Sequence, residues 1–236
     1  MSSRLDWLTA RPIAHRGLHD GNKLVWENTL SAFQLAIDNN YAIECDLQFA
    51  NDGTPVVFHD DDMERLCNIK GDVRSKTAQE LGLLSIGGTR DRVPSLKQLT
   101  ALVKGQVPLV LELKGRLDDD EGFADSVLET LHAYDGPLAL MSFDVWLLRD
   151  FKELGSRFPL GLTAEGVKPD DFAAHEQAME IGLDFISYNV MHLPNDFVAQ
   201  QRNNMIPVIT WTVRNQEQAR HTYAHADQMT FEGFRP

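Results

Sequence analysis

Short runs of apolar residues recur along the whole chain, and they are bounded by Gly, Pro, Asn or Asp. Each run is almost continuously hydrophobic, which is typical of strands that are buried on both faces. On this pattern we predict eight strands, at residues 12–15, 42–48, 108–113, 137–142, 159–163, 183–188, 206–211 and 226–231.

Amphipathic stretches between these strands predict helices. Thr29 and Asp170 suit an N-cap or first helical turn, and Gly155 and Gly182 suit helix C-caps. Strands that alternate with helices pair in parallel through right-handed crossovers. Eight such units in 236 residues predict an α/β protein, a closed (β/α)₈ barrel that forms a single domain over residues 1–236.

One segment departs from this alternation. The strand at 42–48 is followed closely by Asn51-Asp52-Gly53 and then by the apolar TPVVFHD. A connection that short joins only antiparallel strands, so the second run is not the next parallel strand of the barrel. We therefore predict a small insertion after strand 2, at about residues 50–95. It consists of a hairpin arm that carries His59 and an irregular or helical piece that ends at Val93-Pro94.

The charge and composition narrow the function classes. Hydrophobic residues make up 43% of the chain and charged residues 24%, as in a globular protein with a core. The net charge of −13 opposes binding to nucleic acid or anionic membranes, whereas a small phosphate ester is still a possible ligand at a local cationic site. Association into a homo-oligomer is left open by the sequence.

Targeting signals are not evident in the sequence. The N-terminal residues contain no apolar core of the kind found in secretory signals, and no window approaches 18 apolar residues. The two cysteines, Cys45 and Cys67, have neither a metal-binding nor a redox spacing. We therefore predict a cytoplasmic protein.

We expect three carboxylates to lie close together, because the C-terminal ends of the strands converge on one face of a barrel. Glu44 and Asp46 are two residues apart on one strand and point to the same side, and Glu112 is near the end of the next parallel strand. Such a cluster suits Mg²⁺ or Ca²⁺. The alternative is that Glu44 pairs with Lys114 and that Asp46 caps a loop.

Two of the eight histidines differ from the others. His15 and His59 each end a predicted strand and are followed at once by a charged residue. Two imidazoles at one barrel mouth suit general base and general acid catalysis near neutral pH. The remaining histidines are assigned structural or surface roles; they are His19, His132, His175, His192, His221 and His225.

Two cations accompany these groups. Arg16 follows His15, and Lys114 follows Glu112 with the same two-residue spacing as the acidic pair. They could bind a phosphate or simply neutralise the neighbouring carboxylates. Phosphate, a divalent metal and two histidines together indicate phosphoryl transfer. No glycine-rich nucleotide loop is present, because Gly87-Gly88 lacks the surrounding motif.

These residues lie in motifs whose order resembles that of the glycerophosphodiester phosphodiesterase family, over nearly the whole chain. HRG, the ExD pair and the HD after a hairpin are jointly specific. The motifs are HRG (15–17), WENT (26–29), ECD (44–46), NDGTPVVFHDDDMERLC (51–67), GDV (71–73), RVPSLKQL (92–99), LELKG (111–115), SFD (142–144) and WTV (211–213). The resemblance implies a TIM barrel with a small insertion after strand 2.

The resemblance also implies roles for individual residues. It implies one divalent cation, Mg²⁺ or Ca²⁺, and a small phosphodiester as substrate. Trp211 matches an aromatic residue on the alcohol side of the pocket, although plain core packing would explain it equally well. The family's metal ligands fall on Glu44, Asp46 and Glu112, its histidine pair on His15 and His59, its phosphate contacts on Arg16 and Lys114, and its supporting residues on Glu27, Asn28 and Asp60.

The chain departs from the family pattern at three places. Trp26 stands where the family usually has Pro, and Phe231-Glu232 stands where its last strand usually ends in Thr-Asp. The arm between His59 and Pro94 is also short. These departures bear on substrate preference and leave the metal and histidine positions untouched.

The expected reaction is metal-assisted hydrolysis of glycerophosphodiesters, the deacylated phospholipid head groups, to glycerol 3-phosphate and an alcohol. In the family picture, the glycerol 2-hydroxyl attacks the phosphorus and water opens the resulting cyclic phosphate. We assign His15 as the base and His59 as the acid. The alternatives are a lyase that releases the cyclic phosphate and a non-catalytic barrel that binds phosphate.

Overall fold

Eight parallel strands close into a barrel in the computed structural model, which describes residues 5–117 and 119–236. Residues 1–4, part of the N-terminal segment considered above, and residue 118 lie outside the described residues. β1 pairs with both β2 and β9, and this closes the ring. The strands are β1 (Ile13–Ala14), β2 (Ala42–Phe49), β4 (Leu109–Leu113), β5 (Leu138–Ser142), β6 (Leu160–Ala164), β7 (Phe185–Asn189), β8 (Val208–Val213) and β9 (Gln228–Phe231). The predicted (β/α)₈ barrel is confirmed.

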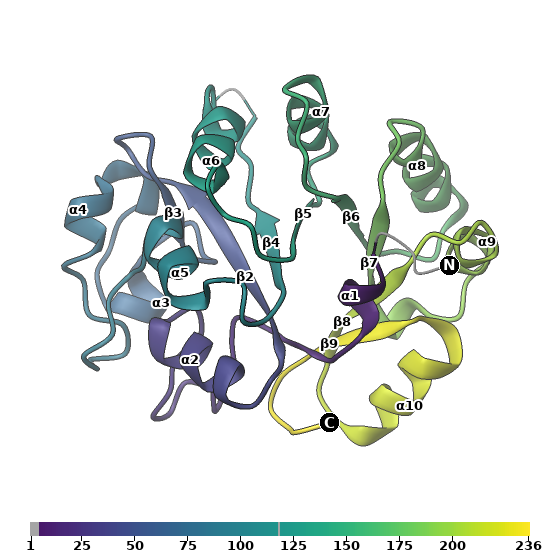
Figure 1. The fold of residues 1–236 in the computed structure, drawn as a ribbon, viewed down its shortest axis with the longest axis horizontal. Coiled ribbons are helices and arrows are strands. Elements are labelled where there is room, and N and C mark those ends of the chain that lie inside the picture. The colour runs from purple at the N-terminus through teal and green to yellow at the C-terminus, as the bar shows by residue number, and fades with distance from the viewer. Residues whose placement is uncertain (1–4, 118) are drawn as a thin grey trace.

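Helices surround the barrel (Figure 1). Thr29 caps the first of them by accepting a hydrogen bond from the backbone N–H of Ala32, and Asp170 lies in the first turn of α8. No helix among the described residues is long and apolar enough to cross a membrane. The outer helices are α2 (Leu30–Asp38), α5 (Leu96–Val103), α6 (Phe123–Leu131), α7 (Val145–Glu153), α8 (Pro169–Met179), α9 (Asp196–Asn203) and α10 (Gln216–His225).

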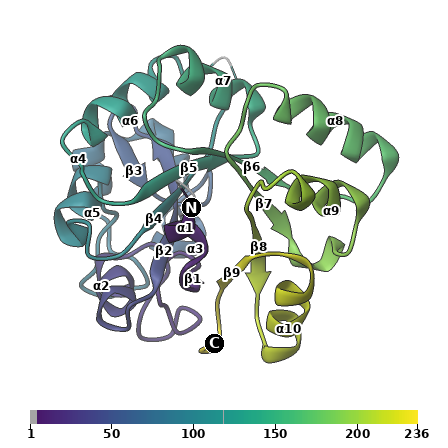
Figure 2. The ribbon, with the colours of Figure 1, turned by 45° about the vertical axis from the view of Figure 1, so that its right-hand side comes forward.

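A separate apolar cluster fills the inside of the barrel at its N-terminal end. The short helix α1 (Asp6–Thr9) lies near the centre of the ring in Figure 2 and contributes Leu8 to this cluster. Phe185 fills the barrel from β7, and a side chain at Gly161 on β6 would collide with its ring. The ionisable side chains inside the barrel therefore lie at the opposite, C-terminal end of the strands.

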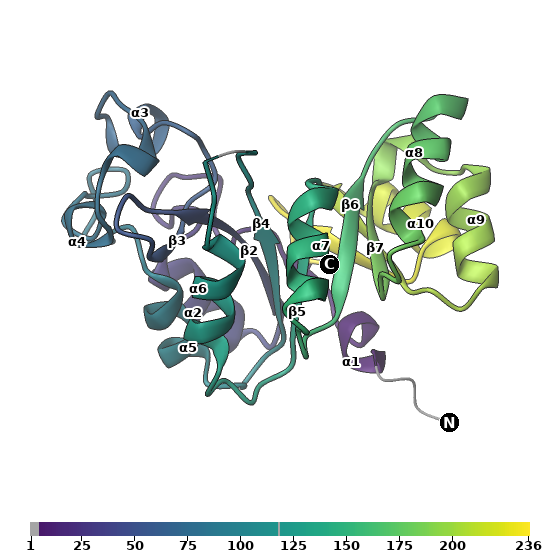
Figure 3. The ribbon, with the colours of Figure 1, turned by 90° about the horizontal axis from the view of Figure 1, so that it is seen from above.

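The segment between β2 and α5 forms the insertion. β3 (Pro55–Val57) pairs with β2 in the antiparallel direction, which confirms the predicted hairpin arm. It is followed by α3 (Glu64–Cys67), the 3₁₀ turn η1 (Val73–Ser75) and α4 (Ala78–Leu81). These elements share a small apolar core of their own, and they stand beyond β3, at the end of the molecule far from α8–α10 (Figure 3).

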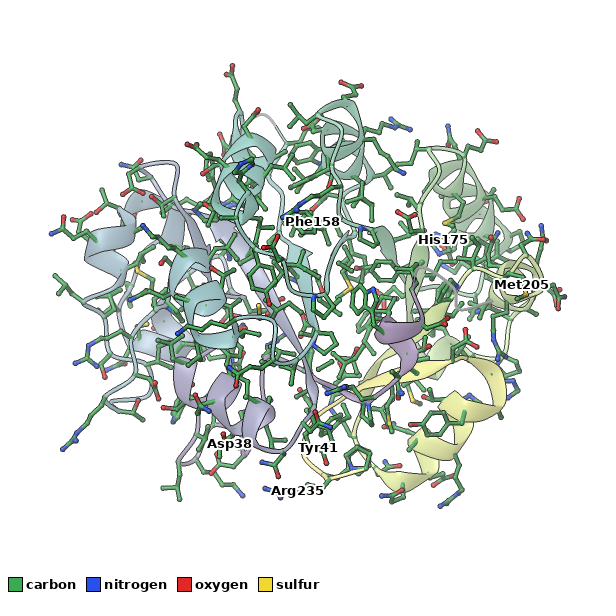
Figure 4. The ribbon with its side chains drawn as sticks, in the orientation of Figure 1. Asp38, Tyr41, Phe158, His175, Met205 and Arg235 are labelled. Carbon is green, nitrogen blue, oxygen red and sulfur yellow. The ribbon has the colours of Figure 1, made fainter. Side chains whose placement is uncertain are left out.

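The C-terminal residues close the barrel against α2. The ring of Phe231 packs edge-on against Tyr41 at 4.9 Å between centroids, and Arg235 donates to the side-chain oxygen of Asn39. Figure 4 shows Arg235 next to Asp38 and Tyr41 at the lower edge of the molecule. These contacts hold the end of β9 beside β1.

Candidate active site

The candidate site lies inside the barrel at the C-terminal ends of its strands. Ile13 and Val110 belong to the apolar cluster inside the barrel. His15 and Glu112, two residues further along the same strands, therefore face inward as well. The same alternation turns the acidic pair of β2 into the barrel.

Three buried carboxylates form the centre of the site. One oxygen from each of Glu44, Asp46 and Glu112 lies within 4.8 Å of the others, and none of the three residues is more than 8% exposed. Glu44 Oε2 accepts a hydrogen bond from the backbone N–H of Arg16 at 2.9 Å. Glu44 Oε1 is buried and has no hydrogen-bond partner among the described residues.

Two cations contact this cluster but do not balance its charge. Lys114 Nζ donates to Glu112 and lies 3.2 Å from Asp46 Oδ1, and Arg16 Nε lies 3.3 Å from Asp46 Oδ2. Burial would raise the pKa of Asp46, but Lys114 and Arg16 outweigh it, so this pKa is lowered. Burial together with Asp46 and Glu112 raises the pKa of Glu44 well above its usual range.

A hard divalent cation fits this arrangement. When all three are ionised, the carboxylates carry one more charge than Arg16 and Lys114 neutralise, and one buried oxygen of Glu44 has no hydrogen-bond partner among the described residues. Carboxylate oxygens are the ligands that Mg²⁺ and Ca²⁺ prefer. Arg16 and Lys114 pair with carboxylates in this structure, and their contact with a phosphate stays a prediction.

His15 lies beside the carboxylate cluster. Its Nε2 is 3.9 Å from Glu44 Oε2, and its Nδ1 is 2.6 Å from Glu232 Oε2. Burial lowers the pKa of His15, and the hydrogen bond to Glu232 opposes this effect only in part. Burial therefore favours the neutral form of the imidazole, and one of its nitrogens contacts a carboxylate.

His59 has a similar arrangement on the other side of the cluster. Its Nδ1 is 2.8 Å from Asp60 Oδ1, and Asp60 also accepts hydrogen bonds from Arg65. The side chain of His59 is 32% exposed, against 12% for His15. Each imidazole thus has its own carboxylate, but the two environments differ in their access to water.

Glu27 and Asn28 support these groups. Asn28 Nδ2 donates to Asp46 Oδ2 at 2.8 Å and so orients this carboxylate. Glu27 accepts hydrogen bonds from Arg16, Arg65 and the side chain of Asn22. Burial would raise the pKa of Glu27, but Arg65 and Arg16 lower it to about 2.

Several residues of the site were not selected from the sequence. Glu232 was interpreted only as a departure that bears on substrate preference, whereas its carboxylate contacts His15. His19, which was assigned a structural or surface role, is nearly buried, and its Nε2 lies 3.7 Å from Glu232 Oε2. A signal existed for Glu232, because it follows a predicted strand as Arg16 does. Arg65 and Arg74 had no comparable signal.

Arg74 connects the insertion to the barrel. It donates to the backbone carbonyl of Lys114 at 2.7 Å and forms a buried ion pair with Asp120. Arg116 joins the same two segments through Asp72 and Asp61, at the surface. These contacts fix the chain at Lys114 and in the segment that follows it.

The opposite wall of the mouth is aromatic and mostly neutral. Trp211 packs edge-on against Phe143 at 5.5 Å between ring centroids and donates from Nε1 to the carbonyl of Ser187. Asn189 donates to the side chain of Glu165. Phe143 is 43% exposed and Trp211 is partly exposed, so this pair is not enclosed in the core.

The departure at Trp26 has a structural explanation. Its ring packs with the apolar core of the insertion and covers Gly87, where a side chain would collide with it. Gly87 also has a positive φ of 58°, which favours glycine. Trp26 therefore joins the first βα loop to the insertion.

A buried carboxylate cluster and two imidazoles, each paired with a further carboxylate, lie at the C-terminal ends of the strands, where (β/α)₈-barrel enzymes carry their active sites. Residues 15–231 match the model of the glycerophosphoryl diester phosphodiesterase family. The chain therefore belongs to this family, and it is a phosphoric diester hydrolase.

Individual relatives agree with this assignment. The chain is similar to YhdW of Bacillus subtilis, provisionally named a glycerophosphodiester phosphodiesterase, with 30% identity over 88% of this chain and 87% of that protein. It is 28% identical to the glycerophosphodiester phosphodiesterase of Caldanaerobacter subterraneus, over 87% of this chain and 86% of that one. The fold is similar to that of an Oleispira antarctica phosphodiesterase in complex with the product sn-glycerol-3-phosphate. That comparison has a TM-score of 0.84 and 24% identity, over 94% of this chain and 92% of that chain.

Proposed function

We propose that this protein hydrolyses glycerophosphodiesters to glycerol 3-phosphate and an alcohol, with the help of one divalent cation, Mg²⁺ or Ca²⁺. The observation that carries the proposal is the cluster of three buried carboxylates within 4.8 Å of one another, next to His15 and in electrostatic reach of His59. The name of the Caldanaerobacter relative and the product bound to the Oleispira phosphodiesterase support the choice of substrate.

Glu44, Asp46 and Glu112 would hold the cation. When bound, it supplies positive charge to a non-bridging phosphate oxygen and stabilises the charge that develops there. Arg16 and Lys114, which border the same carboxylates, would contact the other phosphate oxygens. Arginine provides a planar fork and lysine a point charge for this purpose.

The two histidines divide the proton transfers. Burial lowers the pKa of His15 and so favours its neutral form, and because Nδ1 donates to the Glu232 carboxylate, Nε2 of the neutral ring has a free lone pair. It therefore acts as the base that removes the proton from the attacking hydroxyl. His59 is more exposed, and its Nδ1 faces the carboxylate of Asp60, so we assign it as the acid that protonates the leaving alcohol.

The alcohol part of the substrate would lie against the wall opposite the carboxylates. Phe143 and Trp211 present aromatic surface there, and the carboxylate of Glu165 lies on the same wall. Aromatic faces and a carboxylate suit a cationic alcohol such as choline or ethanolamine. Cytoplasmic location, the single-domain organisation and association into an oligomer stay predictions.

Product analysis tests the proposal. The metal-stripped protein is incubated with glycerophosphocholine or glycerophosphoethanolamine, with and without Mg²⁺ or Ca²⁺, and glycerol 3-phosphate is measured. We expect release only with the metal, and the Glu44→Gln variant should no longer respond to it. Accumulation of a cyclic phosphate would identify a lyase instead. No release despite intact metal binding would reject this substrate class or indicate a binding protein.

A further inference from the structure

The carboxylate of Glu232 is placed to control His15. We propose that Glu232 is a positioning residue that fixes the ring and tautomer of His15, and that Arg214 anchors Glu232 for this task. This inference rests on the proposed function, in which His15 is the base. Glu232 lies at the end of the last strand, where the chain departs from the family pattern. The inference therefore means that this departure affects the reaction through His15.

Both oxygens of Glu232 are engaged. Oε2 lies 2.6 Å from His15 Nδ1, and Oε1 accepts a hydrogen bond from Arg214 Nε at 2.7 Å. The side chain of Glu232 is only 19% exposed, whereas that of Arg214 is 60% exposed. Arg214 therefore reaches in from the surface and leaves one carboxylate oxygen aimed at the imidazole.

The backbone holds the two partners in register. The N–H of His15 donates to the carbonyl of Phe231, and the N–H of Glu232 donates to the carbonyl of Val213. Glu232 thus lies between the residues that follow β1 and β8, directly beside His15 and Arg214. Because the backbone at Phe231 and Glu232 is held on both sides, the side chain of Glu232 starts from a fixed position beside the imidazole.

The contact determines which ring nitrogen carries the proton. A carboxylate accepts a hydrogen bond only, so Nδ1 of His15 must be the protonated nitrogen. Nε2 then presents its lone pair on the side of Glu44, 3.9 Å away. Asp60 makes the corresponding contact with Nδ1 of His59 at 2.8 Å. The two imidazoles therefore make the same type of contact, His59 with the residue that follows it and His15 with a carboxylate 217 residues away along the chain.

Asp227 offers a matched control. It lies at the other end of β9, just before Gln228, and one of its oxygens accepts hydrogen bonds from Arg202. Its other oxygen accepts from the backbone N–H of Val208 and contacts no histidine among the described residues. Asp227→Asn and Glu232→Gln each remove one arginine-paired charge next to an end of β9, but only Glu232 contacts His15.

The test compares kcat and KM for glycerophosphocholine in these variants. We expect Glu232→Gln to lower kcat by about 10- to 100-fold, because the amide can also donate and so supports the wrong tautomer. KM and the affinity for Mg²⁺, measured by calorimetry on the metal-stripped protein, should change less than about twofold. Glu232→Asp should restore part of kcat, and Asp227→Asn should leave it unchanged.

The outcomes separate the inference from the function on which it rests. Normal turnover of His15→Ala would overturn the role of His15 itself. Loss of activity in His15→Ala but normal kcat in Glu232→Gln would overturn only the positioning role. An equal fall of kcat in Asp227→Asn and Glu232→Gln would show that Glu232 has only a structural role, through its ion pair with Arg214. Adding Glu232→Gln to His15→Ala should have no further effect, because both changes act on one group.

A second variant keeps the test decisive if Glu232→Gln does not fold. Arg214→Gln removes only the exposed anchor, and we expect a fall in kcat of about 3- to 10-fold at constant KM. In the wild-type protein, the Nδ1 proton of His15 should give a resonance far downfield of the backbone amides. Unchanged kcat in Arg214→Gln together with the absence of this resonance would overturn the inference.

Discussion

The two halves of the barrel mouth are built from different kinds of residue. On the side of β1, β2, β4 and β9, the mouth carries a cluster of ionisable side chains that pair with one another, as with Lys114 on Asp46 and Arg16 on Glu27. On the side of β5 to β8, the inward side chains are aromatic or neutral apart from Glu165, as with the Phe143–Trp211 pair.

We expect this difference to separate two tasks in the proposed reaction. The phosphate group develops charge in the transition state. Charged residues that are fixed before the substrate binds stabilise this charge without rearrangement. Beyond its leaving oxygen, the alcohol undergoes little change in charge, so the wall that contacts the rest of it needs only shape and weak contacts. The charged half should therefore control kcat, and the aromatic half should control which alcohol is accepted.

The largest expected effect comes from the histidines of the charged half. His15→Ala and His59→Ala should each lower turnover by about 10²- to 10⁴-fold, because each removes one proton transfer. Turnover of glycerophosphocholine and a thermal melt are measured together, and the melt should change little. His132→Ala, in an exposed position after α6, is the control. Near-normal turnover in either catalytic variant would refute the acid–base assignment.

The next-largest effect concerns the ion pairs that connect the insertion to the charged half of the barrel. Arg74→Met should lower the free energy of unfolding by about 3–5 kcal/mol, because it leaves the buried carboxylate of Asp120 without its partner. Chemical denaturation measures the change. Arg116→Met breaks the more exposed pairs with Asp61 and Asp72 and should cost less than about 1 kcal/mol. Equal losses would show that burial of the ion pair is unimportant here.

Substitutions in the aromatic half should change KM rather than kcat. Trp211→Ala should raise KM for glycerophosphocholine by about 3- to 30-fold with kcat nearly unchanged, if its ring faces the choline cation. Met205→Ala removes an exposed apolar side chain near α9, away from the mouth, and is the control (Figure 4). A loss of stability without a change in KM would instead assign Trp211 to core packing.

The smallest effect is a pH dependence at Glu27. Its pKa is lowered to about 2, chiefly by Arg65 and Arg16 against the effect of burial. A lowered folded-state pKa adds stability above the unfolded pKa near 4.5, and this stability is lost as the pH falls towards 2. Glu27→Gln should therefore be less stable than wild type by about 1–3 kcal/mol at neutral pH. The difference should shrink below about pH 4, and a gap that stays constant down to pH 3 would contradict the assignment.

The strands and the residues at their ends were predictable because both depend on local spacing. Continuous apolar runs indicated all eight parallel strands, and the observed boundaries lie within two residues of the predicted ones. The two-residue spacing of Glu44 and Asp46 placed both on one face of β2, and the short turn at Gly53 indicated the antiparallel arm.

The contacts between distant segments could not be predicted in this way. Glu232 lies 217 residues from His15, and Arg65 lies 38 residues from Glu27. Such pairs form only after the barrel closes and the insertion folds back. An arginine or glutamate on a loop has the same sequence signature whether it faces water or a buried partner.

The sequence by itself determined the barrel, its family and the residue types at the ends of its strands, because apolar periodicity and motif order are properties of the chain. Only the tertiary structure decided which carboxylate holds which imidazole, that Trp26 packs into the insertion, and that the mouth has a charged half and an aromatic half. These features depend on distances of a few ångströms between strands and loops, which closure of the barrel sets.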